Sequence, residues 1–199
     1  MTIDIAESKL IRNEWKLWLG WTLTTGLGLL IGFLPSGFLA QAFGLGLARV
    51  LSPLLAGILI GMGQWLILRN YLSDCSQWIP AAGAAWAIGY AVGIYIFQIF
   101  PPGLEYGLLG VILFGLVAGG LQWPLLRREI PQIVPWLLAN VLGWSLGFLL
   151  SLWVTNSLSA ALAGSAFLAS LLSLTLTGFV AGAVVGLALV WIVRKPEIE

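Results

Sequence analysis

Residues 57–69 read GILIGMGQWLILR, residues 115–127 read GLVAGGLQWPLLR and residues 182–194 read GAVVGLALVWIVR. Each stretch carries glycine at its first and fifth positions and ends in arginine after an uncharged apolar run. Glycines four residues apart lie on one face of a helix, where they let a second helix approach closely inside a membrane. The three stretches therefore predict membrane helices that pack through a glycine face.

The composition of the whole chain points to lipid as its solvent. Of the 199 residues, 60% are apolar and only 9% are charged, whereas a soluble domain has about 25% charged residues. The net charge is +1 and the basic residues form no long run. Nucleic acid is therefore excluded as a partner, and the lipid bilayer is the expected one.

Uncharged stretches long enough to cross a membrane occur six times, since a crossing helix needs about 20 apolar residues. The predicted spans are Leu17–Gly37, Val50–Leu68, Trp78–Phe100, Tyr106–Leu126, Val134–Val154 and Leu172–Val193. We expect an all-α integral membrane protein with a single six-helix transmembrane domain over residues 1–199. Residues 155–171 are uncharged, and the sequence leaves two assignments open for them: an interfacial or re-entrant segment, or an outward extension of the sixth helix.

The basic residues predict the orientation. With six crossings, Arg49 alone falls on the side opposite to the N-terminus, and the other eight basic residues fall on the N-terminal side. Lysine and arginine accumulate in cytoplasmic loops, so both termini are expected in the cytoplasm. Tryptophans near the predicted cytoplasmic interface are expected to form an aromatic belt: Trp15, Trp18, Trp78, Trp136 and Trp191.

Glycine pairs four residues apart recur in every predicted span, which favours an internal repeat. The even-numbered spans carry the pairs Gly57 and Gly61, Gly115 and Gly119, and Gly182 and Gly186; the odd-numbered spans carry Gly28 and Gly32, Gly89 and Gly93, and Gly143 and Gly147. We interpret the chain as three helical-hairpin repeats related by an axis along the membrane normal. The even-span glycines are the predicted helix-packing residues.

Amides inside the predicted spans are the main candidates for a site. Gln64 and Gln122 each lie five residues before an arginine, and Asn140 lies at a similar depth in the fifth span. A buried amide needs a partner, and interhelical hydrogen bonds in membranes contribute roughly 0.6–2 kcal/mol. We favour such a structural role. The alternative is ligand binding, in which the amides hold a head group or the magnesium of chlorophyll beside Trp65 and Trp123.

The arginines that end the even-numbered spans lie on the predicted cytoplasmic rim. Arg69, Arg127 and Arg194 either anchor the helix ends by reaching into the interface or together bind an anionic lipid. We favour the anchoring role.

Catalytic and metal chemistry are not expected. The chain has no histidine and a single cysteine, which removes the commonest general base, the commonest metal ligand and every paired-cysteine site. The predicted spans contain no Asp, Glu, Lys or Arg, whereas ion-coupled transporters carry ionisable residues there. We therefore expect neither an enzyme nor an ion-driven transporter.

Residues 61–69 and 119–127 resemble a G-x-x-Q-W-L-x-L-R signature of uncharacterised bacterial multipass membrane proteins, many of them cyanobacterial. Residues 142–147, LGWSLG, resemble the companion G-W-x-x-G helix of that group. The likeness covers the central hairpins well and the first and last helices loosely. It implies a bacterial plasma or thylakoid membrane and no particular activity.

The leading functional hypothesis is a non-catalytic accessory or assembly component of a membrane complex, with lipid, chlorophyll or carotenoid as candidate bound molecules and other membrane-protein subunits as candidate partners. The short loops leave no room for a soluble domain, so its working surface is expected within the membrane. The alternative is a pore or facilitator for a small neutral solute, consistent with glycine-rich, uncharged spans.

Overall fold

The computed structural model describes residues 5–72, 75–100, 103–127, 133–158 and 165–194, with side chains from residue 14 onward apart from a few positions. These residues form six helices: α1 (Ile5–Phe33), α2 (Ser36–Leu68), α3 (Trp78–Ile99), α4 (Leu104–Leu126), α5 (Ile133–Ser157) and α7 (Ala166–Arg194). Four helices are long and apolar enough to cross a membrane: α2, α4, α5 from Val134 and α7 from Phe167 to Val193. These helices indicate a membrane protein.

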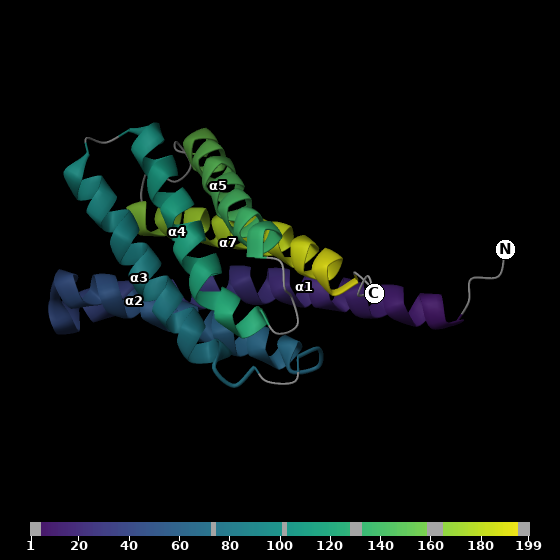
Figure 1. Cartoon of the computed structure of the whole chain (residues 1–199). Helices are drawn as coiled ribbons and strands as arrows, with labels where there is room; N and C mark the ends of the chain where they lie inside the picture. The colour runs from purple at the N-terminus through teal and green to yellow at the C-terminus, as the bar shows by residue number, and fades with distance from the viewer. Residues whose placement is uncertain (1–4, 73–74, 101–102, 128–132, 159–164, 195–199) are drawn as a thin grey trace.

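The helices form a closed ring in chain order. Each helix packs closely against the helix before it and the helix after it, and α7 packs back against α1. Helices across the ring meet only through long side chains in the described ranges, such as Trp21 of α1 and Trp136 of α5. Figure 1 shows the start of α1 and the end of α7 at the same end of this ring. Because neighbouring helices run in opposite directions, Arg69 ends α2 at that end, while Arg49 lies near the other. We name the two ends after these arginines.

Glycines bring the neighbouring backbones together. A Cβ atom on Gly115 of α4 would lie 2.9 Å from the Cα atom of Val141 in α5. A Cβ atom on Gly182 of α7 would lie 2.9 Å from the Cβ atom of Thr25 in α1. Real Cβ atoms essentially never approach so closely, so a side chain at either position would push two helices apart. The ring depends on small residues at these contacts.

The remaining even-span glycines also face a neighbouring helix. Gly57 and Gly61 of α2 both face Ala82 of α3. A Cβ atom on Gly57 would lie 2.7 Å from the Ala82 carbonyl oxygen, and a Cβ atom on Gly61 would lie 2.8 Å from the Ala82 methyl carbon. Gly119 faces Asn140 and Leu137 of α5. Gly186 of α7 faces Trp18 of α1, whose indole Nε1 donates a hydrogen bond to the Ala183 carbonyl oxygen at 2.9 Å.

Side chains fill the middle of the ring in three layers. The first aromatic layer, nearest the Arg69 end, consists of Trp21, Trp78 and Trp136. The polar layer consists of Thr25, Gln64, Gln122 and Asn140. The second aromatic layer consists of Trp86, Phe114 and Trp144. Along α5 the three layers follow one another at four-residue intervals, Trp136, Asn140 and Trp144, which is about 6 Å per step.

Near the Arg49 end, α2 is broken at one residue. Gly44 has a φ of 78°, the positive region that favours glycine, and it separates residues 36–43 from the rest of α2. Proline sets the preceding boundary: α1 ends at Phe33, four residues before the predicted end at Gly37, and Pro35 precedes α2. Pro35 has no backbone N–H to continue the hydrogen-bond ladder of α1.

Two further expectations can be compared with the structure. Residues 166–171 belong to α7, so this part of the open segment 155–171 extends the last helix; residues 159–164 lie outside the described part. The belt assignment is wrong for Trp78 and Trp136, because both side chains are completely buried in the first aromatic layer. They sit on the inner faces of α3 and α5, where ring packing outweighs any preference for the interface.

Candidate functional site in the interior of the helix ring

Gln64 links three helices in the polar layer. Its Nε2 donates to Thr25 Oγ1 of α1 at 3.2 Å, and its Oε1 accepts from the indole Nε1 of Trp78 of α3 at 3.0 Å. Thr25 Oγ1 in turn donates to the Trp21 carbonyl oxygen at 2.8 Å. Asn140, at a similar depth in the fifth span, was a candidate partner for the glutamines, but Gln64 binds Thr25 and Trp78. Neither residue had a signal in the sequence that marked it as the partner.

Gln122 and Asn140 lie in the same layer but, among the described residues, make fewer hydrogen bonds to other helices than Gln64 does. Asn140 Nδ2 donates to the carbonyl oxygen of Trp136, one turn earlier on α5, at 3.0 Å. Gln122 is 94% buried and makes no hydrogen bond within the described residues. The indole N–H of Trp136 is buried and also has no partner there. The equivalent pair, Gln64 and Trp78, is joined by a hydrogen bond, so the two halves of the polar layer differ.

The polar layer encloses a central cavity of about 20 Å³, lined by residues of all three layers, Gln64, Gln122 and Asn140 among them. A cavity needs at least about 10–15 Å³ to hold one water molecule. The central cavity therefore has room for a single water molecule and no room for a lipid head group or a chlorophyll.

The other residues singled out from the sequence lie at the Arg69 end, away from this cavity. Trp65 and Trp123 are partly buried against the first aromatic layer, and the Arg69 guanidinium carbon lies 5.3 Å from the Trp65 ring centroid. Arg127 is exposed at the end of α4. The side chain of Arg194 lies outside the described part. The structure thus brings the amides together but leaves Trp65 and Trp123 outside their layer.

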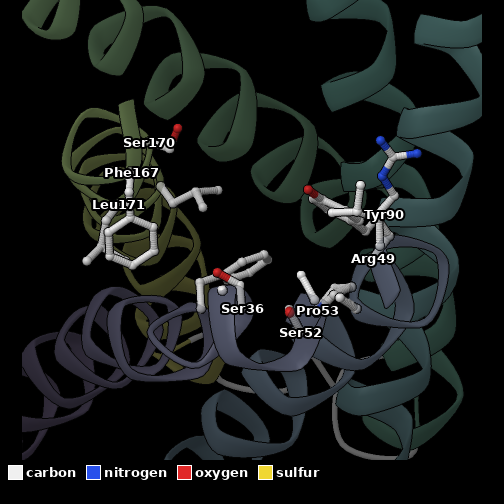
Figure 2. Close-up of a pocket in the computed structure, with 14 residues that line it drawn as sticks. Ser36, Arg49, Ser52, Pro53, Tyr90, Phe167, Ser170 and Leu171 are labelled. Atoms are coloured by element: carbon white, nitrogen blue, oxygen red, sulfur yellow. The ribbon is translucent and has the colours of Figure 1, made fainter. Parts of the chain in front are cut away.

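A much larger space lies at the Arg49 end. This Arg49 cavity has a volume of about 450 Å³ and is lined by α1, α2, α3 and α7. Figure 2 shows Phe167, Ser170 and Leu171 of α7 on one side of the cavity. The facing wall carries Ser36, Arg49, Ser52 and Pro53 of α2 and Tyr90 of α3. Ligand-binding cavities of proteins typically measure about 300–1,000 Å³, so the Arg49 cavity has the size of a ligand site.

The polar groups of the Arg49 cavity are incompletely paired. Ser52 is 97% buried, yet its hydroxyl has no hydrogen-bond partner within the described residues. An unpaired buried hydroxyl costs about 1–3 kcal/mol. Pro53 has no N–H, so the Arg49 carbonyl oxygen lacks its helical donor four residues on. The sequence analysis did not single out these residues as a site. The signal that could have found them is the pair Ser52-Pro53 inside a predicted span, three residues after Arg49.

A second space, the inner chamber, lies between the Arg49 cavity and the second aromatic layer. Its volume is about 300 Å³, and it shares Tyr90 and Leu174 with the Arg49 cavity as lining residues. Trp86, Phe114 and Trp144 also line it, and their ring centroids lie 4.7–5.0 Å apart in edge-to-face packing. The second aromatic layer is therefore the floor of the inner chamber.

Comparison with known proteins adds no relative: no protein-family model, curated protein or solved structure matches the chain. Within the described ranges, no group of three or more Cys, Asp or Glu side chains lies together in a way that could hold a metal ion. The geometry of the cavities and layers is therefore the basis for the function proposed below.

Proposed function

We propose that this chain is a non-catalytic membrane protein with six transmembrane helices, acting as an accessory component of a membrane complex. In this proposal it holds an amphiphilic molecule, a lipid or pigment, in the half of the ring toward the Arg49 end, which contains the Arg49 cavity and the inner chamber and which we name the hollow half. The observation that carries this proposal is the Arg49 cavity: about 450 Å³ of largely apolar space above an interior closed by packed aromatic rings. Such a shape suits a molecule that enters from one side and stays.

The ring supports the six-span part of the proposal. α1 and α3 pack between helices that are long and apolar enough to cross a membrane, so a bilayer around those helices surrounds α1 and α3 as well. In this arrangement the Arg69 end is cytoplasmic and Arg49 lies on the opposite side. Reporter enzymes fused after Lys9, within residues 70–77 and after Lys195 should report the cytoplasm. Reporters within residues 156–165 should report the opposite side; a cytoplasmic signal there rules out this topology.

The glycine contacts support the three-hairpin repeat. Gly57, Gly115 and Gly182 occupy equivalent positions of the three predicted repeats. The closest neighbours of their built Cβ atoms include Ala82, Asn140 and Thr25, respectively, and these are equivalent positions one helix further round the ring. A threefold repeat of one hairpin accounts for this cyclic pattern.

Filling the cavity tests the proposed function. Leu171 lines the Arg49 cavity, so Leu171→Trp should occupy space that a bound molecule needs. Leu168, on the same helix, is 55% exposed and does not line the cavity, so Leu168→Trp is the matched control. Mass analysis of both variants, purified in mild detergent, should find a co-purifying amphiphile lost only from Leu171→Trp. Equal content in wild type and both variants would contradict the proposal.

The second candidate function is a facilitator for a small neutral solute. The observation that favours it is the central cavity, which is polar and lies between the inner chamber and the first aromatic layer. The aromatic rings on both sides would then have to move to let a solute pass. Reconstituted protein that speeds the flux of water or glycerol into liposomes, and that carries no co-purifying amphiphile, would favour this function over the first.

A further inference from the structure

We propose that the amphiphile of the hollow half has an anionic head group, the carboxylate of a fatty acid or the phosphate of an anionic phospholipid, held by Arg49 and Ser52, with its alkyl chain extending into the inner chamber. This inference rests on the proposed function, because it names the ligand class of the same site.

The charge of the cavity selects the sign of the head group. Arg49 is the one cationic residue of the described cavity lining, and no carboxylate lies in that lining. An arginine guanidinium presents parallel N–H donors that match the oxygens of a carboxylate or phosphate. An anion at this position is therefore favoured over a neutral or cationic head group.

Ser52 supplies a second contact for the same head group. It follows Arg49 by three residues, so both lie on one face of α2. Its hydroxyl is buried without a partner in the described part of the cavity and needs an acceptor. In the proposed complex the exposed Arg49 side chain, whose guanidinium points away from Ser52 in Figure 2, turns toward the cavity, and one anionic head group accepts from its N–H groups and from the Ser52 hydroxyl. This removes the unpaired donor that the cavity otherwise leaves in an apolar wall.

The path of the alkyl chain follows from the lining. Phe33, Leu171 and Leu174 give the cavity apolar walls, and the shared residues Tyr90 and Leu174 connect it with the inner chamber. The second aromatic layer closes the far side of that chamber. A chain that passes Tyr90 therefore ends above these rings. The head group stays near Arg49, so the bound molecule has a fixed direction.

The test compares probes that differ only in the head group. Wild-type protein in non-ionic detergent is incubated with palmitate or with hexadecanol, which has the same chain and no charge, and retained probe is measured by native mass spectrometry. We expect about tenfold more palmitate than hexadecanol. Phosphatidylglycerol and phosphatidylcholine are compared in the same way, and the better retained anion, palmitate or phosphatidylglycerol, identifies the source of the head group.

The variants separate this inference from the proposed function. Arg49→Gln should reduce palmitate retention to the level of hexadecanol, and Ser52→Ala should reduce it roughly threefold. Arg69→Gln, which removes the same charge at the other end of α2, should leave the retention of palmitate and of hexadecanol unchanged. Equal retention of palmitate and hexadecanol by wild type, unchanged in Arg49→Gln, overturns the anionic head group and leaves the proposed function standing. Retention of both probes no higher in wild type than in Leu171→Trp overturns both.

Discussion

The two halves of the helix ring are built from the same six helices but differ in how their interiors are filled; we name the half toward the Arg69 end the filled half. Toward the Arg69 end, α1, α3 and α5 each point a tryptophan at the axis, and the rings meet edge to face at 5.8–6.1 Å around Trp21. Toward the Arg49 end, α3 and α4 carry glycines where they line the inner chamber, Gly89, Gly93 and Gly110. Bulky rings fill the axis in one half, whereas small residues leave it hollow in the other.

Two buried polar side chains, Gln64 in the filled half and Ser52 in the hollow half, differ in their pairing. In the filled half, Gln64 is bonded to both Thr25 and Trp78, and such pairing fixes three helices relative to one another. In the hollow half, the buried hydroxyl of Ser52 has no partner in the described structure. Polar groups that are paired hold a fold together, whereas polar groups left unpaired beside a cavity are suited to a ligand. The Gln64 network thus stabilises the assembled helices, whereas Ser52 is available to the proposed ligand.

The largest loss of stability is expected from a bulky residue at a glycine contact between two closely packed helices. Gly115→Leu places side-chain atoms against the backbone of α5, since a Cβ alone would lie 2.9 Å from the Val141 Cα. We expect a loss of about 3 kcal/mol or failure to assemble, because overpacking forces backbone shifts. Gly93→Leu is the matched control in the hollow half, where a Cβ would lie 3.9 Å from its nearest neighbour. Thermal melting that ranks Gly93→Leu as the more damaging change would reverse the comparison.

A smaller effect is expected from removing polar groups. Gln64→Leu should lower stability by roughly 1–2 kcal/mol, because it breaks two interhelical hydrogen bonds and leaves the Trp78 N–H unpaired. Gln122→Leu should cost less, since Gln122 makes no hydrogen bond in the described structure. Ser52→Ala should leave the melting temperature of ligand-free protein unchanged or slightly higher. Equal losses for Gln64→Leu and Ser52→Ala would show that the two halves do not differ in pairing.

The smallest effect concerns the two arginines of α2. Arg69→Gln removes a cation positioned 5.3 Å from the Trp65 ring centroid, an interaction that contributes about 0.5–1 kcal/mol at exposed sites. Arg49→Gln removes no comparable contact and should leave the stability of ligand-free protein unchanged. Melting curves recorded in the same detergent test this difference, and a larger loss for Arg49→Gln would assign Arg49 a structural role.

Some helix ends could be predicted from the sequence because apolarity ends there, but the start of the second span was wrong, since α2 begins at Ser36 and not at Val50. The predicted ends of the second and fourth spans, Leu68 and Leu126, agree with α2 and α4, and the predicted start at Trp78 agrees with α3. The burial of Trp78 and Trp136 was missed, since interfacial and inward-facing tryptophans look alike near a span end. Hydropathy reports the depth of a residue and not the direction in which its helix faces.

The Arg49 cavity was beyond sequence reasoning for a related reason. Its walls come from α1, α2, α3 and α7, which only the closed ring brings together. Gln64 and Gln122 could be singled out because an amide in an apolar span is conspicuous by itself. Ser52 and Tyr90 are unremarkable within their own helices, and they become a site only when α2, α3 and α7 surround one space.

Access of a small reagent to the two halves tests most directly whether one is filled and the other hollow. Ala48 lines the Arg49 cavity and Ala118 lines the central cavity, and both are buried, at 6% and 3% exposure. Each is changed to cysteine in a Cys75→Ala background, and the rate of reaction with N-ethylmaleimide is measured in washed, ligand-free protein. We predict that Ala48→Cys reacts about tenfold faster or more, because reaction requires access to the thiol, and that added palmitate slows it. Reaction of Ala118→Cys at the same rate or faster would contradict the closed interior and reveal an open path through the ring.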